Sequence, residues 1–322
     1  MVNAETFTIP DRDLTFLVIR KLSNFLLFLI LLFSSKIWYA FNSSTLVGIL
    51  ILNFFAILLL AASKSATLSI RDFNSSLIIG LNNEELNMKK DLAKKIFRET
   101  RKDYNVISDQ FSRAREKIWE EMKFLADDYL IEGEKVLDLG CGNGRFYELL
   151  NKGDYIGVDS SEELIKIARK RYPKVKFQVA DALNLPFPDN YFDKVYAIAV
   201  FHHIPSKELR EKFLSEIKRV LKPEGFMIIT VWNLWQKERT KKIIFKSLID
   251  KFLKRTGLDF KDILMRWEGK EGFYFHAFTK GELKQLIKGA GFKIEDKGEI
   301  LVNKAKKKKW PNSNLYIIAK KP

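Results

Sequence analysis

The chain has 322 residues, with 56 Lys and Arg against 40 Asp and Glu, and therefore carries a formal net charge of +16. One cysteine excludes a disulfide framework, and three histidines and one cysteine provide no metal-ligand spacing, so no metal is expected. The basic excess favours an anionic partner, either nucleic acid or a membrane surface.

Residues 1–87 differ in composition from the rest of the chain. They hold six basic and six acidic residues, so the whole excess of positive charge falls on residues 88–322. Residues 46–62 contain no charge, and residues 22–41 form a second apolar stretch interrupted by Lys36. These lengths predict a two-helix membrane hairpin over 22–62, after an N-terminal segment 1–21. Basic residues before and after the pair predict that both ends lie in the cytoplasm.

Two interpretations of this first part stay open. In one, the chain is membrane-anchored, with a linker and basic helix over 63–103 and the domain that follows in the cytoplasm. In the other, Met88 is the true start and the protein is cytoplasmic, because the lysine-rich sequence after Met88 is ordinary for the start of a soluble protein.

Residues 136–146, Val-Leu-Asp-Leu-Gly-Cys-Gly-Asn-Gly-Arg-Phe, are the most informative stretch. The apolar run predicts a buried parallel strand, and helical spacing resumes over 145–150. The glycines between them allow a sharp turn and a close approach of backbone to a ligand. Asp159, at the end of the next predicted strand (155–159), can accept hydrogen bonds from ribose hydroxyls.

The spacing of these glycines argues against a dinucleotide. A dinucleotide fingerprint is G-x-G-x-x-G, whereas this chain has G-x-G-x-G with Arg145 in the place of the third glycine. The pattern resembles motif I of the class I S-adenosylmethionine (SAM) methyltransferases. That resemblance implies SAM as the cofactor.

The later elements agree with this fold. Further strands are predicted over 175–181, 192–200, 226–231, 292–302 and 315–319, and helices from Ser160 onward and over 207–221. We therefore expect a Rossmann-like class I methyltransferase domain over 104–322, with a seven-stranded, mostly parallel sheet whose last strand is antiparallel. An insertion at about 233–280 is expected to form a lid over the substrate.

The resemblance also implies which residues hold the cofactor. Strands that end in acidic residues place carboxylates on one edge of a parallel sheet, the edge where open α/β folds bind ligands. In the family, the residue matching Asp181 hydrogen-bonds the adenine amino group. The expected cofactor-binding residues are Asp138, Gly140, Gly142, Asn143, Gly144, Asp159, Ser160, Asp181, Ala182 and Ala199.

Three further stretches of sequence reduce the range of candidate substrates. They carry Phe111, Ser112, Arg115 and Trp119, then paired His202 and His203, then Tyr274, His276 and Gly281-Glu-Leu. In this order they are similar to the eukaryotic tRNA methyltransferases that esterify 5-carboxymethyluridine at the wobble position. The chain departs from that pattern because it lacks a proline before Trp119 and has Gly272 where arginine is frequent.

This second resemblance implies candidate catalytic residues and a possible small activator subunit. The candidates are His202, His203, Tyr274 and His276, although the histidines can also shape the cofactor pocket and the other two can simply line a lid. A quinol or phenol acceptor would need a base among them, whereas an ionised carboxylate would not.

Basic side chains suggest an anionic acceptor. Arg113 and Arg115 suit a carboxylate or phosphate, unless they are solvated surface. Lys306, Lys307 and Lys308 lie between the last two predicted strands, and a second basic stretch covers 237–255. Methylation of tRNA is the leading hypothesis. A small or lipidic acceptor, such as a quinone precursor at the membrane, is the alternative, and SAM binding without turnover is a third.

Overall fold

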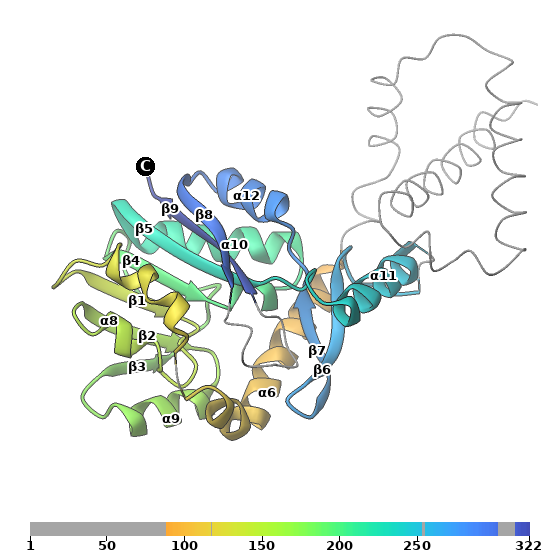
Figure 1. Cartoon of the computed structure of the whole chain (residues 1–322), viewed down its shortest axis with the longest axis horizontal. Helices are drawn as coiled ribbons and strands as arrows, with labels where there is room; N and C mark the ends of the chain where they lie inside the picture. Colours follow the sequence, from red (N-terminus) through yellow and green to blue (C-terminus); the bar gives the residue numbers. More distant parts are fainter. Residues whose placement is uncertain (1–87, 117, 253–254, 302–312) are drawn as a thin grey trace, which may run out of the picture. The chain divides into compact units, whose positions relative to one another are not determined.

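The computed structural model describes residues 88–322 apart from 117, 253–254 and 302–312. A seven-stranded sheet runs through this part in the order β3-β2-β1-β4-β5-β9-β8 (Figure 1). Its strands are β1 (Lys135–Leu139), β2 (Asp154–Asp159), β3 (Lys176–Val179), β4 (Phe192–Ile198), β5 (Leu221–Trp232), β8 (Lys293–Leu301) and β9 (Ser313–Lys320). Only β9 pairs antiparallel with its neighbours, as the sequence predicts.

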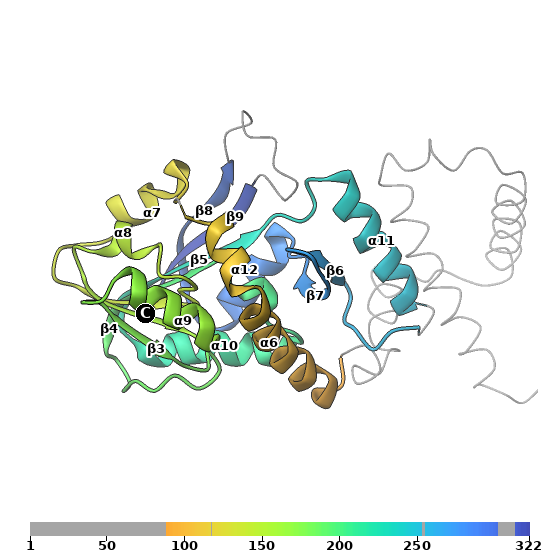
Figure 2. The ribbon, with the colours of Figure 1, turned by 90° about the horizontal axis from the view of Figure 1, so that it is seen from below.

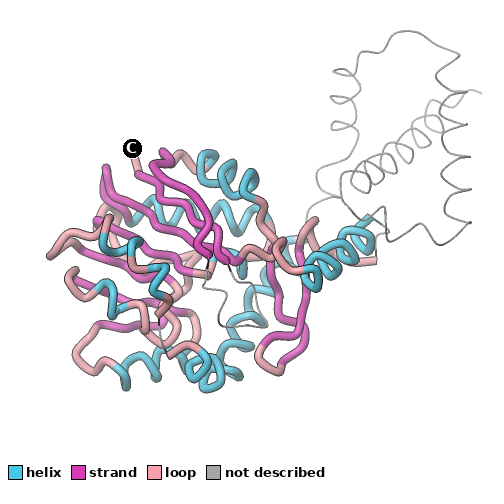
Figure 3. Tube along the Cα trace, in the orientation of Figure 1, coloured by secondary structure: helices cyan, strands magenta, loops and turns pink. Residues whose placement is uncertain are grey.

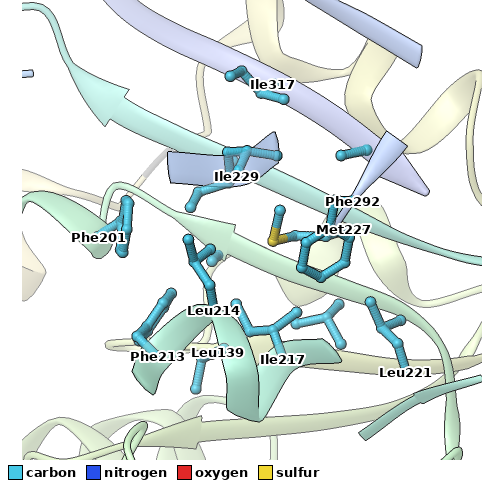
Figure 4. Close-up of a cluster of buried hydrophobic side chains, with 14 of the residues drawn as sticks. Leu139, Phe201, Phe213, Leu214, Ile217, Leu221, Met227, Ile229, Phe292 and Ile317 are labelled. Atoms are coloured by element: carbon cyan, nitrogen blue, oxygen red, sulfur yellow. The ribbon is translucent and has the colours of Figure 1, made fainter. Parts of the chain in front are cut away.

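Helices cover both faces of the sheet (Figure 3). Apolar side chains on alternate strand positions build a core on each face. Leu137, Val195 and Met227 face α10 (Lys207–Val220) and α12 (Lys280–Gly289), in the cluster drawn in part in Figure 4. Their neighbours Val136 and Tyr196 face the opposite layer. That layer holds α7 (Phe124–Asp127), α8 (Tyr147–Leu150) and α9 (Glu162–Arg171). Because side chains alternate along a strand, both faces of this parallel sheet are apolar.

Two local predictions differ from the structure. The helix after the glycine turn covers only α8, instead of 145–150. The sequence Lys222-Pro-Glu-Gly, predicted to separate helix and strand, lies inside β5. The pairing of β4 with β5 shifts register between Phe192 and Lys194, beside this proline. A strand accepts proline at such irregular positions because no ladder hydrogen bond from its nitrogen is required there.

A long helix and the expected insertion stand over the carboxyl ends of the strands. The helix is α6 (Lys90–Ala114), which contacts α9 and the second strand of a hairpin, β6 (Asp262–Trp267) and β7 (Lys270–His276) (Figure 2). The insertion also holds α11 (Glu238–Phe252), while η1 (Glu120–Met122) and η2 (Phe201–His203) are short 3₁₀ turns. The domain start expected at residue 104 falls inside α6, since no helix breaker interrupts that sequence.

The predicted location at a membrane is corrected. From residue 88 onward, wherever the chain is described, no helix has both the length and the apolar character needed to cross a bilayer. The predicted hairpin over 22–62 and the segment 1–21 lie outside the described residues. This finding overturns the membrane-anchored location, and no membrane partner enters the function proposed for the chain.

Candidate active site

The glycine turn after β1 brings backbone to the floor of a cavity of about 350 Å³. Gly140 has φ +77°, and a Cβ there would lie 2.2 Å from Cγ2 of Val200. The Gly140 and Cys141 amides donate to the carbonyl of Val158 at 2.7 and 2.9 Å. Only glycine fits this left-handed, crowded position, so the turn exposes backbone rather than side chains.

Asp138 lies beneath the turn and is almost fully buried. The Tyr155 hydroxyl donates to its Oδ2 at 2.7 Å. Burial raises the pKa of Asp138 to about 7, because a carboxylate is poorly solvated there. Asp138 lines the cavity, in the place expected from the sequence.

Asp159 joins the glycine turn to the next helix. Its Oδ2 accepts from the Gly142 amide at 2.9 Å and its Oδ1 from the Ser161 amide at 2.8 Å. The Ser160 amide also bonds this carboxylate. A carboxylate has about four lone-pair sites, so these donors fix its orientation and leave capacity for a further hydroxyl. Ser160 and Asn143 line the same end of the cavity, and Ala199 lines the cavity from the end of β4.

The chain after β3 contributes backbone and methyl groups. Ala182 lines the cavity, but Asp181 is not among the lining residues. The Asp181 carboxylate instead accepts from the Leu183 amide at 2.8 Å. Gly144, with φ +73°, is crowded by Phe177 and also lies outside the lining. Their expected cofactor contacts stay predictions.

His203 is the histidine that reaches the cavity. Its Nδ1 lies 3.2 Å from the carbonyl of Tyr274, which can only accept, so the ring proton is on Nδ1. Its Nε2 therefore accepts from the Tyr104 hydroxyl at 2.8 Å. Burial lowers the pKa of His203 to about 4, so the ring is neutral at pH 7.

His202, unlike its neighbour His203, does not reach the cavity. Its ring is fully buried, stacks with Trp232 and Phe275 and is not among the lining residues. The Trp232 amide donates to its Nδ1 at 3.4 Å, and burial lowers the pKa of His202 well below its ordinary value. We assign His202 to packing between β5 and the β6–β7 hairpin.

Tyr274 and His276 belong to a buried polar network away from the cavity lining. Asp262 Oδ1 lies 2.7 Å from the Tyr274 hydroxyl and 2.6 Å from His276 Nδ1. Arg210 donates to Asp262 Oδ1 at 3.2 Å and to the Tyr274 hydroxyl at 3.1 Å, and Glu282 lies 2.8 Å from His276 Nε2. The network ties α10, the hairpin and α12 together. The expected catalytic role of these two side chains is therefore not retained.

Of the two candidate arginines, Arg115 lines the cavity and Arg113 does not. The Arg115 guanidinium lies 4.4 Å from the ring centroid of Phe111 and 4.5 Å from that of Trp267. Glu268 pairs with it at 3.3 Å. Arg113, at the end of α6, is exposed. Lys306, Lys307 and Lys308 lie outside the described residues.

Several lining residues were not among the predicted site residues. They come from α6, the glycine turn, β5, the hairpin and β9, and are Tyr104, Arg145, Trp232, Trp267, Glu268 and Asn314. The sequence offers a reason to include Arg145 among the site residues, since it replaces a glycine of the dinucleotide motif. It offers no such reason for the others, because only the fold brings these five segments together.

Comparison with known proteins agrees with this geometry. Residues 137–229 match the methyltransferase domain family. A tRNA (carboxymethyluridine(34)-5-O)-methyltransferase of Schizosaccharomyces pombe is 32% identical over 234 residues, which cover 68% of this chain and 94% of the relative. The chain belongs to this methyltransferase family. An Arabidopsis thaliana member with the same name is 38% identical over 135 residues, or 42% of this chain, and the chain spans only 33% of that relative.

Solved structures give the same fold. A SAM-dependent methyltransferase from Methanosarcina mazei matches with a TM-score of 0.54 and 25% identity, over 61% of this chain and 96% of that one. The chain is a SAM-dependent methyltransferase with a Rossmann-like class I fold.

The cofactor end of the cavity fits SAM. Asp159 has acceptor capacity left for a ribose hydroxyl, and Gly140 and Gly142 line the cavity without side chains, which leaves room for an amino-acid moiety. SAM, when bound, supplies an electrophilic methyl group on a sulfonium. The residues suited to hold it are Asp138, Gly140, Gly142, Asn143, Asp159, Ser160, Ala182 and Ala199.

Proposed function

We propose that this enzyme methylates the carboxylate of 5-carboxymethyluridine at the wobble position of tRNA, forming a methyl ester. The observation that carries the proposal is Arg115, a guanidinium held between two aromatic rings in the wall of the cavity. A guanidinium offers a planar set of donors that matches a carboxylate. Its partner Glu268, at 3.3 Å, engages only part of that donor set.

The state of His203 supports a carboxylate acceptor. A carboxylate has a pKa of about 4 and is ionised at pH 7, so no proton has to be removed before its oxygen attacks the methyl carbon. The carbon–sulfur bond breaks as the carbon–oxygen bond forms, and no net proton is released. A phenol or quinol would need a base, whereas His203 has both nitrogens engaged and a pKa lowered to about 4.

The surface leading to the cavity is basic. On the first turns of α6 and just before it, five exposed cations make no ion pair within the described chain: Lys89, Lys90, Lys94, Lys95 and Arg98. The same helix continues to Phe97, Thr100 and Tyr104, which line the cavity. Exposed Arg239 and Lys242 add to the charge on α11. Such a surface suits the phosphates on either side of a nucleotide placed in the cavity.

The relatives supply the substrate class. The Schizosaccharomyces pombe protein, nearly all of which this chain spans, is named for transfer to carboxymethyluridine 34. The activator subunit implied by the sequence resemblance stays a prediction. Transfer by the purified chain alone would show that such a subunit is dispensable.

The test uses the full chain, tritiated SAM and tRNA that carries 5-carboxymethyluridine. We expect label in the tRNA, released by mild alkali as volatile methanol, because a methyl ester hydrolyses and an N-methyl or ribose O-methyl group does not. Alkali-stable label would contradict the ester. Labelling of small or lipidic acceptors with no label in tRNA would contradict the substrate class.

A further inference from the structure

The acceptor side of the cavity holds a buried amide whose nitrogen makes no hydrogen bond. Asn314 is 1% exposed and lines the cavity, and its Nδ2 has no hydrogen-bond partner among the residues that the structure describes. Leaving a buried donor unpaired costs about 1–3 kcal/mol. Buried polar groups in folded proteins are almost always paired, so this nitrogen is suited to a ligand.

The sheet register fixes where this amide lies. Asn314 on β9 pairs with Trp232 on β5 and with Ile300 on β8. Cross-strand partners project from the same face of a sheet, so Asn314 and Trp232 line the same wall. Trp267 packs against Trp232, with ring centroids 4.6 Å apart, and also contacts Arg115. A planar amide, two indole rings and the guanidinium therefore share one end of the cavity.

These groups match the parts of a modified uracil. A carboxamide has one donor and one acceptor side by side, and the imide edge of uracil has the complementary pair in N3–H and O4. Proteins read unstacked RNA bases in this way, with aromatic rings against the base and polar groups on its Watson–Crick edge. The C5 substituent of uracil is next to O4. A base held at O4 and N3 therefore directs its C5 carboxymethyl group to the side of O4.

We propose that Asn314 recognises the N3–O4 imide edge of the target pyrimidine, with Trp232 and Trp267 forming the wall that the base contacts. This inference rests on the proposed function and adds its specificity-determining residue. Asn314 selects the base, while Arg115 holds the carboxylate.

A different role for Asn314 is contact with the cofactor. The lining residues assigned to SAM come from the segments around β1, β2, β3 and the end of β4, whereas Asn314 lies on β9, across β5 from them. The position of Asn314 on β9 therefore favours contact with the acceptor base over contact with SAM. The experiment separates the two roles by their effect on the KM of SAM.

The test compares two anticodon stem-loop RNAs, one with 5-carboxymethyluridine and one with its N3-methyl derivative. With the unchanged enzyme, we expect kcat/KM to fall roughly 10–100-fold on the N3-methyl RNA, because the imide hydrogen is gone. Asn314→Leu should show a similar loss on the first RNA and less than about threefold discrimination between the two. Its KM for SAM should stay within about twofold. Asn151→Asp, at an exposed asparagine after α8, is the control.

The outcomes distinguish this inference from the proposed function. Equal rates on both RNAs with the unchanged enzyme would overturn the role of Asn314 and leave the esterification standing, whether or not Asn314→Leu folds. Discrimination that survives in Asn314→Leu, or a large rise in the KM of SAM, would also overturn it. No transfer to either RNA, by a chain that binds SAM and in the presence of the activator subunit that the resemblance implies, would overturn the proposed function, and the assignment of Asn314 with it.

Discussion

The cofactor end of the cavity is lined largely by backbone and small side chains, whereas the acceptor end is lined by large ones. Residues 138–182 provide the glycine turn, Asp159 and the two alanines after β3, Ala180 and Ala182, within a single βαβαβ stretch. The acceptor end takes Tyr104, Arg115, Trp232, Trp267 and Asn314 from four separate elements. A contiguous motif can thus define the cofactor, while the substrate depends on how distant segments meet.

The largest effect is expected at the cofactor end. Asp159→Ala removes the acceptor for the Gly142 and Ser161 amides together with the capacity to bind hydroxyls. Hydrogen bonds to a charged group contribute about 1.5–3 kcal/mol each, so we expect SAM to bind on the order of 1,000-fold more weakly. Isothermal titration with S-adenosylhomocysteine measures this. Asp154→Ala, at the exposed start of the same strand, should bind within about twofold of the unchanged chain.

At the acceptor end, Arg115→Ala should lower kcat/KM for tRNA about 100-fold and leave the KM of SAM nearly unchanged, because it removes the charge-assisted hydrogen bonds to the acceptor carboxylate. Arg115→Lys should recover only part of the rate, since a lysine lacks the planar fork. Arg113→Ala, two residues away and outside the cavity lining, should cost less than about threefold. Equal losses at the two arginines would contradict the cavity assignment.

Arg113 and Arg115 show which features of the site can be predicted from the sequence and which cannot. The succession of strands and helices along the chain, the glycine turn and the acidic strand ends follow from local patterns, because strand and helix periodicity and turn chemistry are encoded within short windows of sequence. Which arginine faces the cavity depends on how α6 packs against β7, a contact between segments about 160 residues apart. Long-range packing also decides the position of Tyr274 and His276. Their sequence pattern predicts a place in the active site, but the fold puts their polar groups in a network with Asp262.

A third effect concerns the surface rather than the cavity. Lys94, Lys95 and Arg98 of α6 make no ion pair with the residues that the structure describes. Removing all three charges in Lys94→Ala/Lys95→Ala/Arg98→Ala should weaken tRNA binding about tenfold at physiological salt. The slope of log K against log salt should become shallower by about 0.7–0.9 for each phosphate that the variant no longer neutralises.

The control for α6 removes the same charge at the opposite edge of the sheet, with Lys152→Ala/Lys174→Ala/Lys176→Ala before and at the start of β2 and β3. Binding and salt slope should stay unchanged there. An equal effect of both triple variants would mean that tRNA responds to net charge, and would leave α6 without a specific role.

The smallest effect is on stability, where the two ends respond to acid in opposite directions. The pKa of His203 is lowered to about 4 in the folded state, so from pH 6.5 to 4 the unfolded chain binds more protons and stability falls as pH falls. The pKa of Asp138 is raised to about 7, so from pH 7 to 4 the folded chain binds more protons and stability rises as pH falls. Over pH 4–6.5 the two contributions largely cancel.

Single substitutions at His203 and Asp138 should show the contribution of each residue to the pH dependence of the free energy of unfolding. Relative to the unchanged chain, His203→Gln should become more stable on acidification and Asp138→Asn less stable, each by about 1 kcal/mol per pH unit. Urea unfolding from pH 7 to pH 4.5 measures both slopes. If His203→Gln instead lost stability on acidification relative to the unchanged chain, the neutral histidine at the acceptor end would be wrong, and with it the argument that the acceptor needs no base.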